Sequence, residues 1–171
     1  VGATHAFAVD KFTPMVELKI SAAKSSFGIG SRIYVHLDLI GHPELNPFAS
    51  PADFPERMCL YPALSDQSGF MIELRNEKGR LLSMVPAKDR RDRRIAVAGI
   101  SDGGHIYRQI KKGIFESMTL PLSRWFDMSQ PGSYSLRVRY QVFEASTRWT
   151  GPQTSNLLLL TVEEKPWWKF W

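Results

Sequence analysis

The segment from Pro131 to Val142 constrains the fold more than any other part of the sequence. A Pro–Gly pair, which favours a turn, leads directly into a run in which apolar and polar side chains alternate. The apolar positions are Tyr134, Leu136, Val138, Tyr140 and Val142. The polar positions are Ser133, Ser135, Arg137, Arg139 and Gln141. A period of two indicates a strand that packs on one face and meets water on the other, as in a β-sandwich.

Three more segments show the same alternation. Residues 15–22 and 32–39 place apolar side chains at every second position, so we expect two neighbouring half-buried strands. Residues 155–162 are expected to return as the last strand. The side chains that we expect to point inward are Val16, Leu18, Ile20, Ile33, Val35, Leu37, Leu39, Leu158, Leu160 and Val162. Val35 and Leu37 should share one core with Tyr134, Leu136 and Val138.

Residues 70–85 are expected to form a β-hairpin. Apolar side chains alternate from Phe70 to Leu74, and the turn that follows ends at Gly79, where glycine adopts a positive φ without steric cost. Residues 80–85 would then return as the second arm of this hairpin.

The next elements give a weaker pattern. Residues 105–120 favour one or two short strands on either side of a Lys-Lys-Gly turn. Residues 119–128 are expected to begin extended and to end in a single helical turn. Ser123 is the expected N-cap of that turn, and Trp125 and Phe126 should close one end of the core.

The chain reads as one domain without internal repeats. We assign residues 1–13 to an N-terminal segment, residues 14–163 to the sandwich and residues 164–171 to an aromatic tail. Residues 41–68 are expected to form a long loop, because proline cannot donate to a central β-ladder. The prolines of this loop are Pro43, Pro47, Pro51, Pro55 and Pro62. Long loops commonly carry function, which makes residues 41–68 a candidate partner surface.

The net charge of +5 favours anionic partners without selecting one. Basic residues gather between positions 88 and 94, where a solvated loop and a partner surface are both open interpretations. The candidate partner residues in this run are Arg90, Arg91, Arg93 and Arg94. Nucleic-acid binding is not expected, because no aromatic residue that could stack on a base lies between Phe70 and Tyr107.

Residues for catalysis or metal binding do not form a recognisable pattern. The single cysteine, Cys59, excludes an internal disulfide and a cysteine-based zinc site. The four histidines lack the spacing that brings two imidazoles to one metal, and no Gly-x-Ser-x-Gly motif is present. The sequence therefore predicts a protein without enzymatic activity, metal or cofactor.

Two aromatic features are candidate contact sites. Trp149 is expected at the tip of a hairpin, where it would stack on a sugar or a partner, or fold back over the sandwich. The tail combines two lysines with Trp167, Trp168 and Trp171, a mixture that suits a bilayer interface or an apolar groove on a partner. Docking of these rings on their own domain is the alternative.

Export is suggested by Ala6, Phe7 and Ala8, which have the small-x-small form that signal peptidase prefers. Residues 1–8 would then be the end of a signal region, and the protein would be periplasmic, cell-surface or extracellular. No apolar run reaches the roughly 20 residues that a membrane-spanning helix needs.

The layout of residues 14–162 resembles that of exported bacterial immunoglobulin-like domains. The resemblance rests on the strand of residues 16–21, the Phe-Gly-Ile-Gly-Ser-Arg-Ile-Tyr-Val-His-Leu segment that begins at Phe27, and the hairpin of residues 70–79. It extends to residues 122–138 and to the last strand, residues 155–162. The resemblance implies an all-β fold, an immunoglobulin-like antiparallel β-sandwich of seven to eight strands with one long Pro-rich loop. Bacterial proteinase inhibitors of the intracellular type are more distantly similar.

Three functions are consistent with these expectations. The first is a non-catalytic protein-interaction or structural module of an exported or envelope-associated assembly, with another protein as partner. A membrane surface or an anionic polymer is also open as a partner. The second function is a proteinase inhibitor that acts through an exposed loop, and the third is an accessory domain of a secreted hydrolase.

Overall fold

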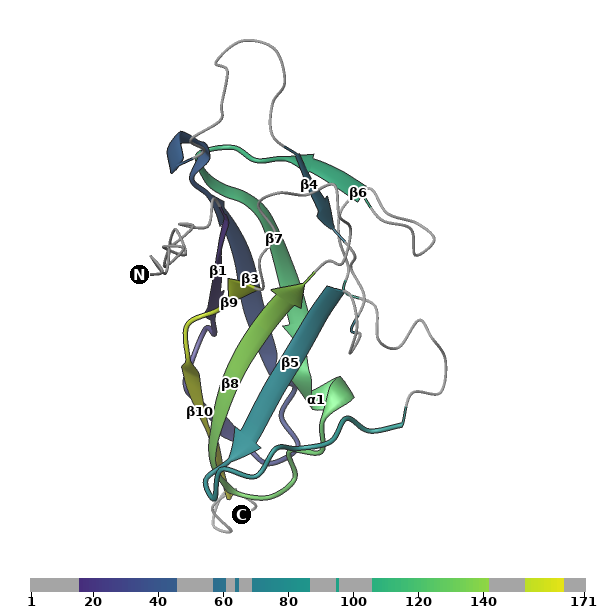
Figure 1. Cartoon of the computed structure of the whole chain (residues 1–171). Helices are drawn as coiled ribbons and strands as arrows, with labels where there is room; N and C mark the ends of the chain where they lie inside the picture. Colours follow the sequence, from purple (N-terminus) through teal and green to yellow (C-terminus); the bar gives the residue numbers. More distant parts are fainter. Residues whose placement is uncertain are drawn as a thin grey trace, which may run out of the picture.

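The computed structural model describes residues 16–45, 57–60, 64, 69–86, 95, 106–141 and 153–164 (Figure 1). Two β-sheets are stacked in these residues. The three-stranded sheet has the order β1 (Val16–Ser21), β3 (Tyr34–Gly41) and β7 (Gly113–Pro121). The five-stranded sheet has the order β2 (Ser26–Gly28), β10 (Leu158–Glu163), β8 (Gly132–Gln141) and β5 (Gly69–Asn76), with β9 (Gln153–Thr154) also on β8. A separate antiparallel pair consists of β4 (Arg57–Leu60) and β6 (Ile106–Gln109).

The three-stranded sheet follows the alternation in the sequence. β1 and β7 both pair antiparallel with β3, and Leu18 lies opposite Leu39. The inward side chains of this sheet are almost fully buried. They include Val16, Leu18, Ile20, Val35, Leu37, Leu39, Met118 and Leu120. The expected adjacency of the first two long strands is therefore confirmed.

β8 is the central strand of the five-stranded sheet and pairs antiparallel with both β5 and β10. β2 pairs parallel with β10, so the expectation of purely antiparallel sheets is wrong at this strand. Residues 22–25 carry the chain from the first sheet to the second. β2 consequently does not fold back on β1 as a hairpin arm, and it meets the last strand in the parallel direction.

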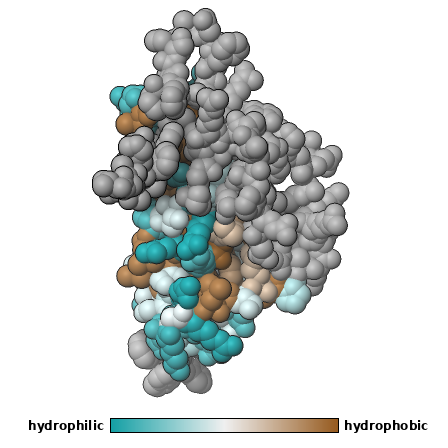
Figure 2. All heavy atoms as spheres, viewed as in Figure 1, coloured by the Kyte–Doolittle hydropathy of each residue, from teal (hydrophilic) through white to brown (hydrophobic). Residues whose placement is uncertain are grey.

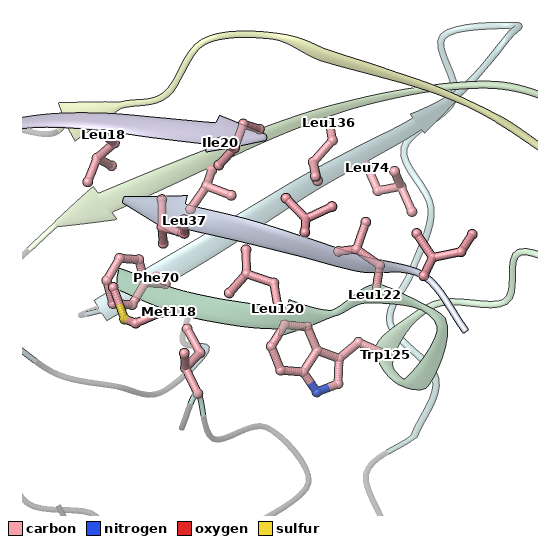
Figure 3. Close-up of a cluster of buried hydrophobic side chains, with 14 of the residues drawn as sticks. Leu18, Ile20, Leu37, Phe70, Leu74, Met118, Leu120, Leu122, Trp125 and Leu136 are labelled. Carbon is pink, nitrogen blue, oxygen red and sulfur yellow. The ribbon is translucent and has the colours of Figure 1, made fainter. Parts of the chain in front are cut away.

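The hydrophobic core lies between the two sheets (Figure 3). Leu37 from β3 and Leu136 from β8 both point into it, and both are fully buried. The rings of Phe70 and Tyr140, which are direct cross-strand partners, lie 4.5 Å apart between centroids. Because each sheet buries one apolar face against the other, the chain is an all-β sandwich, as the sequence predicts.

One end of the core is closed by α1 (Leu122–Trp125), a single helical turn in which Trp125 is buried. The expected turn is therefore present, but Ser123 is not its N-cap. Pro121 holds that position without a side-chain hydrogen bond. Ser123 lies inside the turn, and its Oγ accepts a hydrogen bond of 3.0 Å from the backbone N–H of Ile33. The hydroxyl thus joins α1 to the residue before β3.

Two sequence expectations need correction. Residues 80–85 do not form a full second hairpin arm. Leu81 bridges to β5, but Val85 donates its N–H to the carbonyl of Trp125, so the segment leaves β5 for α1.

Residues 57–60, inside the Pro-rich loop, form β4; they contain no proline, which leaves their N–H groups free to pair with β6. A 3₁₀ turn, η1 (Pro43–Leu45), follows β3.

Candidate interaction surface

The partner residues predicted from the sequence lie outside the described residues, so those predictions are not tested by the structure. They are Arg90, Arg91, Arg93, Arg94, Trp149, Trp167, Trp168 and Trp171. Most of the Pro-rich loop of residues 41–68 also falls outside the described ranges.

A β-bulge between β9 and β10 shapes the edge of the five-stranded sheet. Arg139 pairs with Thr154 and Leu136 with Leu158, so residues 155–157 face only two residues of β8. The Ser155 hydroxyl takes the place of a backbone carbonyl and accepts a 2.9 Å hydrogen bond from the N–H of Val138. The ladder is thereby maintained across the extra residue.

Two leucines in and next to the bulge lie on the protein surface. Leu157 and Leu159 are 49% and 62% exposed, although Leu160 beside them is buried. Leu159 lies opposite Ser135 of β8, one of the outward positions of that strand. These leucines are therefore part of the outer face of the five-stranded sheet.

Three arginines occupy the same outer face. Arg137 and Arg139 are alternate residues of β8, and Arg75 lies on β5 opposite Ser135. All three are exposed. Glu73 lies directly opposite Arg137. We call this surface the arginine face and define it by Glu73, Arg75, Ser135, Arg137, Arg139, Leu157 and Leu159.

The charges of the arginine face do not cancel. Arg139 Nε lies 3.0 Å from Glu73 Oε1, and Glu73 is the only carboxylate among the residues that define the face. Arg75 donates from Nη1 to the carbonyl oxygen of Gly79 at 3.0 Å, which positions the guanidinium without neutralising it. Within the described residues Arg137 has no ion pair. Glu163, the carboxylate of β10, lies four residues beyond Leu159, roughly 13 Å along the strand.

The outward face of the three-stranded sheet has a different character. Lys19 lies opposite Asp38, and the Ser117 hydroxyl donates a 2.6 Å hydrogen bond to Asp38 Oδ1. Glu17 approaches His42, with 3.4 Å between Oε2 and Nε2. Cationic and anionic groups alternate on this face, and its described strands carry no arginine.

Figure 1 presents the five-stranded sheet toward the viewer, with β8 and β5 in front. In Figure 2, which has the same orientation, hydrophilic and hydrophobic side chains intermingle over the coloured part of the molecule. The arginine face combines charge with apolar area, because the exposed Leu157 and Leu159 lie beside its arginines, whereas a purely solvated sheet face would be mainly polar.

A pocket of about 540 Å³ lies at the end of the sandwich, between residues 76–83 and 127–134. Cationic Lys78 and Arg80 share it with anionic Glu77 and Asp127. Tyr134 forms part of its wall and donates a 2.6 Å hydrogen bond from its hydroxyl to the carbonyl oxygen of Gln130. This balance of charges does not favour one class of ligand.

Local contacts shift the pKa values of two titratable groups in this pocket, Tyr134 and Asp127. Burial raises the pKa of Tyr134, and the negative charges of Asp127 and Glu77 raise it further. Hydrogen bonds from the side chain and backbone of Ser129 lower the pKa of Asp127. These shifts favour the hydrogen-bonded neutral phenol and the ionised carboxylate at neutral pH.

No group of three or more metal-ligating side chains occurs among the described residues. His42 lies between Glu17 and Glu44, but its ring nitrogens stand 3.4 and 3.6 Å from their carboxylate oxygens, as in ion pairs. No helix in the described part of the chain is long and apolar enough to cross a membrane. Comparison of the sequence with protein-family models and with curated proteins finds no match.

Sequence reasoning did not identify the arginine face as a candidate site. The alternation places Arg137 and Arg139 outward, but it does not show which strand lies beside them. The signal lies in the pairing of β5 with β8, because that register sets Glu73 and Arg75 next to the β8 arginines. The alternation in the last strand gives a second signal, because it places Leu157 and Leu159 at outward positions.

Proposed function

We propose that the chain is a non-catalytic protein-interaction module and that it binds its partner through the arginine face. The observation that carries this proposal is the combination of three arginines with Leu157 and Leu159 on one sheet. Arginine is enriched in protein interfaces, while lysine and acidic residues are depleted. The arginine face has no lysine and one carboxylate, in agreement with that composition.

An immunoglobulin-like architecture is part of the proposal. In such sandwiches strands A, B and E form one sheet, and strands C, F and G form the other. The orders β1-β3-β7 and β10-β8-β5 correspond to A-B-E and G-F-C. A tyrosine at the start of strand F that bonds to an upstream backbone group is another hallmark. Tyr134 stands in this position on β8 and bonds to Gln130, which supports the assignment.

We further propose that this module works in an exported or envelope-associated assembly. The support for this location comes from the sequence alone, in the small-x-small segment that ends at Ala8. Fractionation of cells that make the full-length protein tests this part separately. Recovery in the cytosolic fraction would contradict it and would leave the interaction proposal standing.

The interaction proposal is tested by photo-crosslinking in cells that make the protein. A benzoylphenylalanine at Leu159 places the crosslinker on the arginine face, and one at Thr119 places it on the outward face of the other sheet. We expect a discrete adduct from position 159 and little adduct from position 119. Equal adducts from both positions, or none from 159, would contradict the proposal.

A further inference from the structure

We infer that the partner segment bound by the arginine face is an extended acidic peptide in which carboxylates and apolar side chains alternate. This inference rests on the proposed function and specifies the partner of the same surface. It is based on the spacing of the arginines, on how their guanidinium groups are held and on the position of the exposed leucines.

The spacing matches an extended chain. Arg137 and Arg139 are two residues apart on β8, which separates their Cα atoms by roughly 7 Å. A bound peptide in extended conformation also places every second side chain on one face with this repeat. Two glutamates at alternate positions can therefore face Arg137 and Arg139 together.

The chemistry favours carboxylates. A guanidinium group offers several N–H donors in a planar fork that fits a carboxylate, whereas an ammonium acts as a compact point charge. The ion pair of Arg139 with Glu73 shows a carboxylate bound on this face, with 3.0 Å between Nε and Oε1. Arg137 is exposed and lies directly opposite Glu73, so its guanidinium can face a second carboxylate on a bound segment.

Two of the three arginines are already positioned. Glu73 holds Arg139, and the carbonyl oxygen of Gly79 holds Arg75. Arginine has several rotatable bonds, so side chains fixed before binding lose less conformational freedom when a ligand arrives. The remaining N–H groups of Arg75 and Arg139 can then bind a ligand at low entropic cost.

The leucines require apolar groups on the partner. Leu159 is the cross-strand neighbour of Ser135, and Leu157 lies in the bulge beside Arg137. Covering two exposed leucines removes apolar surface from water, which favours association. A run of acidic residues alone would leave these leucines uncovered. Alternate side chains of an extended chain point in opposite directions, so the inferred segment lies on edge along β8 and β10. Its carboxylates then point toward Arg137 and Arg139, and the apolar residues between them point toward Leu157 and Leu159.

Other occupants fit less well. A second copy that docks through the same face would bring its own arginines against these, and like charges disfavour that contact. An anionic membrane attracts basic segments mainly through the number of their charges, with a small contribution from each. The arginine face has three cations, of which Glu73 already neutralises one.

The test uses the full chain and a fluorescein-labelled peptide, Glu-Leu-Glu-Val-Glu-Leu-Glu, with binding followed by fluorescence anisotropy. The comparison variants are Arg137→Gln and the double variant Arg75→Gln with Arg137→Gln. Arg32→Gln is the matched control, because Arg32 is exposed and lies before β3, off the arginine face. Circular dichroism confirms that each variant is folded.

We expect saturable binding that weakens about tenfold in Arg137→Gln and further in the double variant, as for loss of charged hydrogen bonds. Arg32→Gln should change the affinity less than twofold, roughly the effect of one distant surface charge. Arg137→Lys should restore only part of the affinity, because it keeps the charge and loses the fork. A peptide of the same composition with its glutamates grouped together should bind more weakly.

Several results would overturn the inference. Equal losses in Arg32→Gln and Arg137→Gln, or equal binding of the grouped peptide, would mean non-specific attraction. Binding to phosphatidylglycerol vesicles without binding to the alternating peptide would assign the face to a membrane. Dimerisation that Arg137→Gln abolishes would assign it to a second copy. If the peptide does not bind while position 159 still crosslinks to a protein, the inference fails and the proposed function remains.

Discussion

The side-chain amide of Asn156 forms both hydrogen bonds that a neighbouring strand would offer to Ile20. Asn156 Oδ1 accepts from the N–H of Ile20 at 2.8 Å, and Nδ2 donates to the carbonyl oxygen of Ile20 at 3.0 Å. Ile20 belongs to β1, at the edge of the three-stranded sheet, and Asn156 belongs to the bulge on the other sheet. One amide thus joins the edges of the two sheets.

This contact predicts a measurable loss of stability on removal of the amide. Asn156→Ala leaves the N–H and C=O of Ile20 without their partner, so we expect the free energy of unfolding to fall by about 1–3 kcal/mol. Urea denaturation monitored by tryptophan fluorescence measures it. Thr154→Ala, an exposed change on β9, is the control and should stay within about 0.5 kcal/mol of the parent. Equal effects would show that Asn156 does not link the sheets.

The Ser155 hydroxyl gives a second prediction at the bulge. Ser155 is buried, and without its Oγ the N–H of Val138 has no acceptor in a dry site. We expect Ser155→Ala to lower the free energy of unfolding by about 1–3 kcal/mol. Ser133→Ala, at an exposed position of β8, should have little effect. Hydrogen exchange of the Val138 amide should also accelerate in Ser155→Ala; unchanged exchange would argue against the role of the hydroxyl.

A leucine-to-alanine change on each face of the five-stranded sheet compares the buried face with the exposed face. Leu136 on β8 is fully buried, whereas Leu159 on β10 is 62% exposed. We expect Leu136→Ala to destabilise the fold by roughly 2–5 kcal/mol, because it leaves a cavity in the core. Leu159→Ala should change stability by less than about 0.5 kcal/mol. Similar losses from the two variants would show that the register of β8 and β10 is wrong.

The raised pKa of Tyr134 predicts that the stability of the fold depends on pH in the alkaline range. Burial raises the pKa of Tyr134 above its ordinary value of 10.0, so the folded state holds the phenolic proton more tightly than the unfolded state does. The stability from this shift is present below pH 10 and is lost as the pH rises through the folded pKa. We expect urea denaturation between pH 9 and 11.5 to show a smaller alkaline loss in Tyr134→Phe. Tyr34→Phe, at an exposed site, is the control and should show the parent's pH dependence of unfolding. If Tyr134→Phe also showed the parent's pH dependence, the assignment would be contradicted.

The sequence predicts the long strands well because their information is local. A period of two in β1, β3 and β8 directly identifies which side chains are buried, and Leu37 and Leu136 lie in the core as expected. The pairing of β4 with β6 is not predictable in this way, since the two strands are distant in sequence and short. The departure of residues 80–85 from β5 also depends on a distant group, the Trp125 carbonyl.

The candidate surface was harder to predict for a related reason. Sequence patterns reveal clusters of residues that are adjacent along the chain, such as the basic run at positions 88–94. The arginine face is assembled across strands, and Arg75 joins Arg137 only through the β5–β8 register. The bulge that exposes Leu157 depends on a serine hydroxyl that replaces a carbonyl, which no pattern of hydrophobicity reveals.

The most direct test of the central claim is to map binding on the ¹⁵N-labelled chain by NMR as the alternating glutamate peptide is added. If the arginine face binds an extended acidic segment of this kind, amide shifts will concentrate in β5, β8 and β10 and saturate with the peptide. The strands of the opposite sheet, β1, β3 and β7, will change little. Shifts centred on β1, β3 and β7, or small shifts over the whole chain that do not saturate, would contradict the claim.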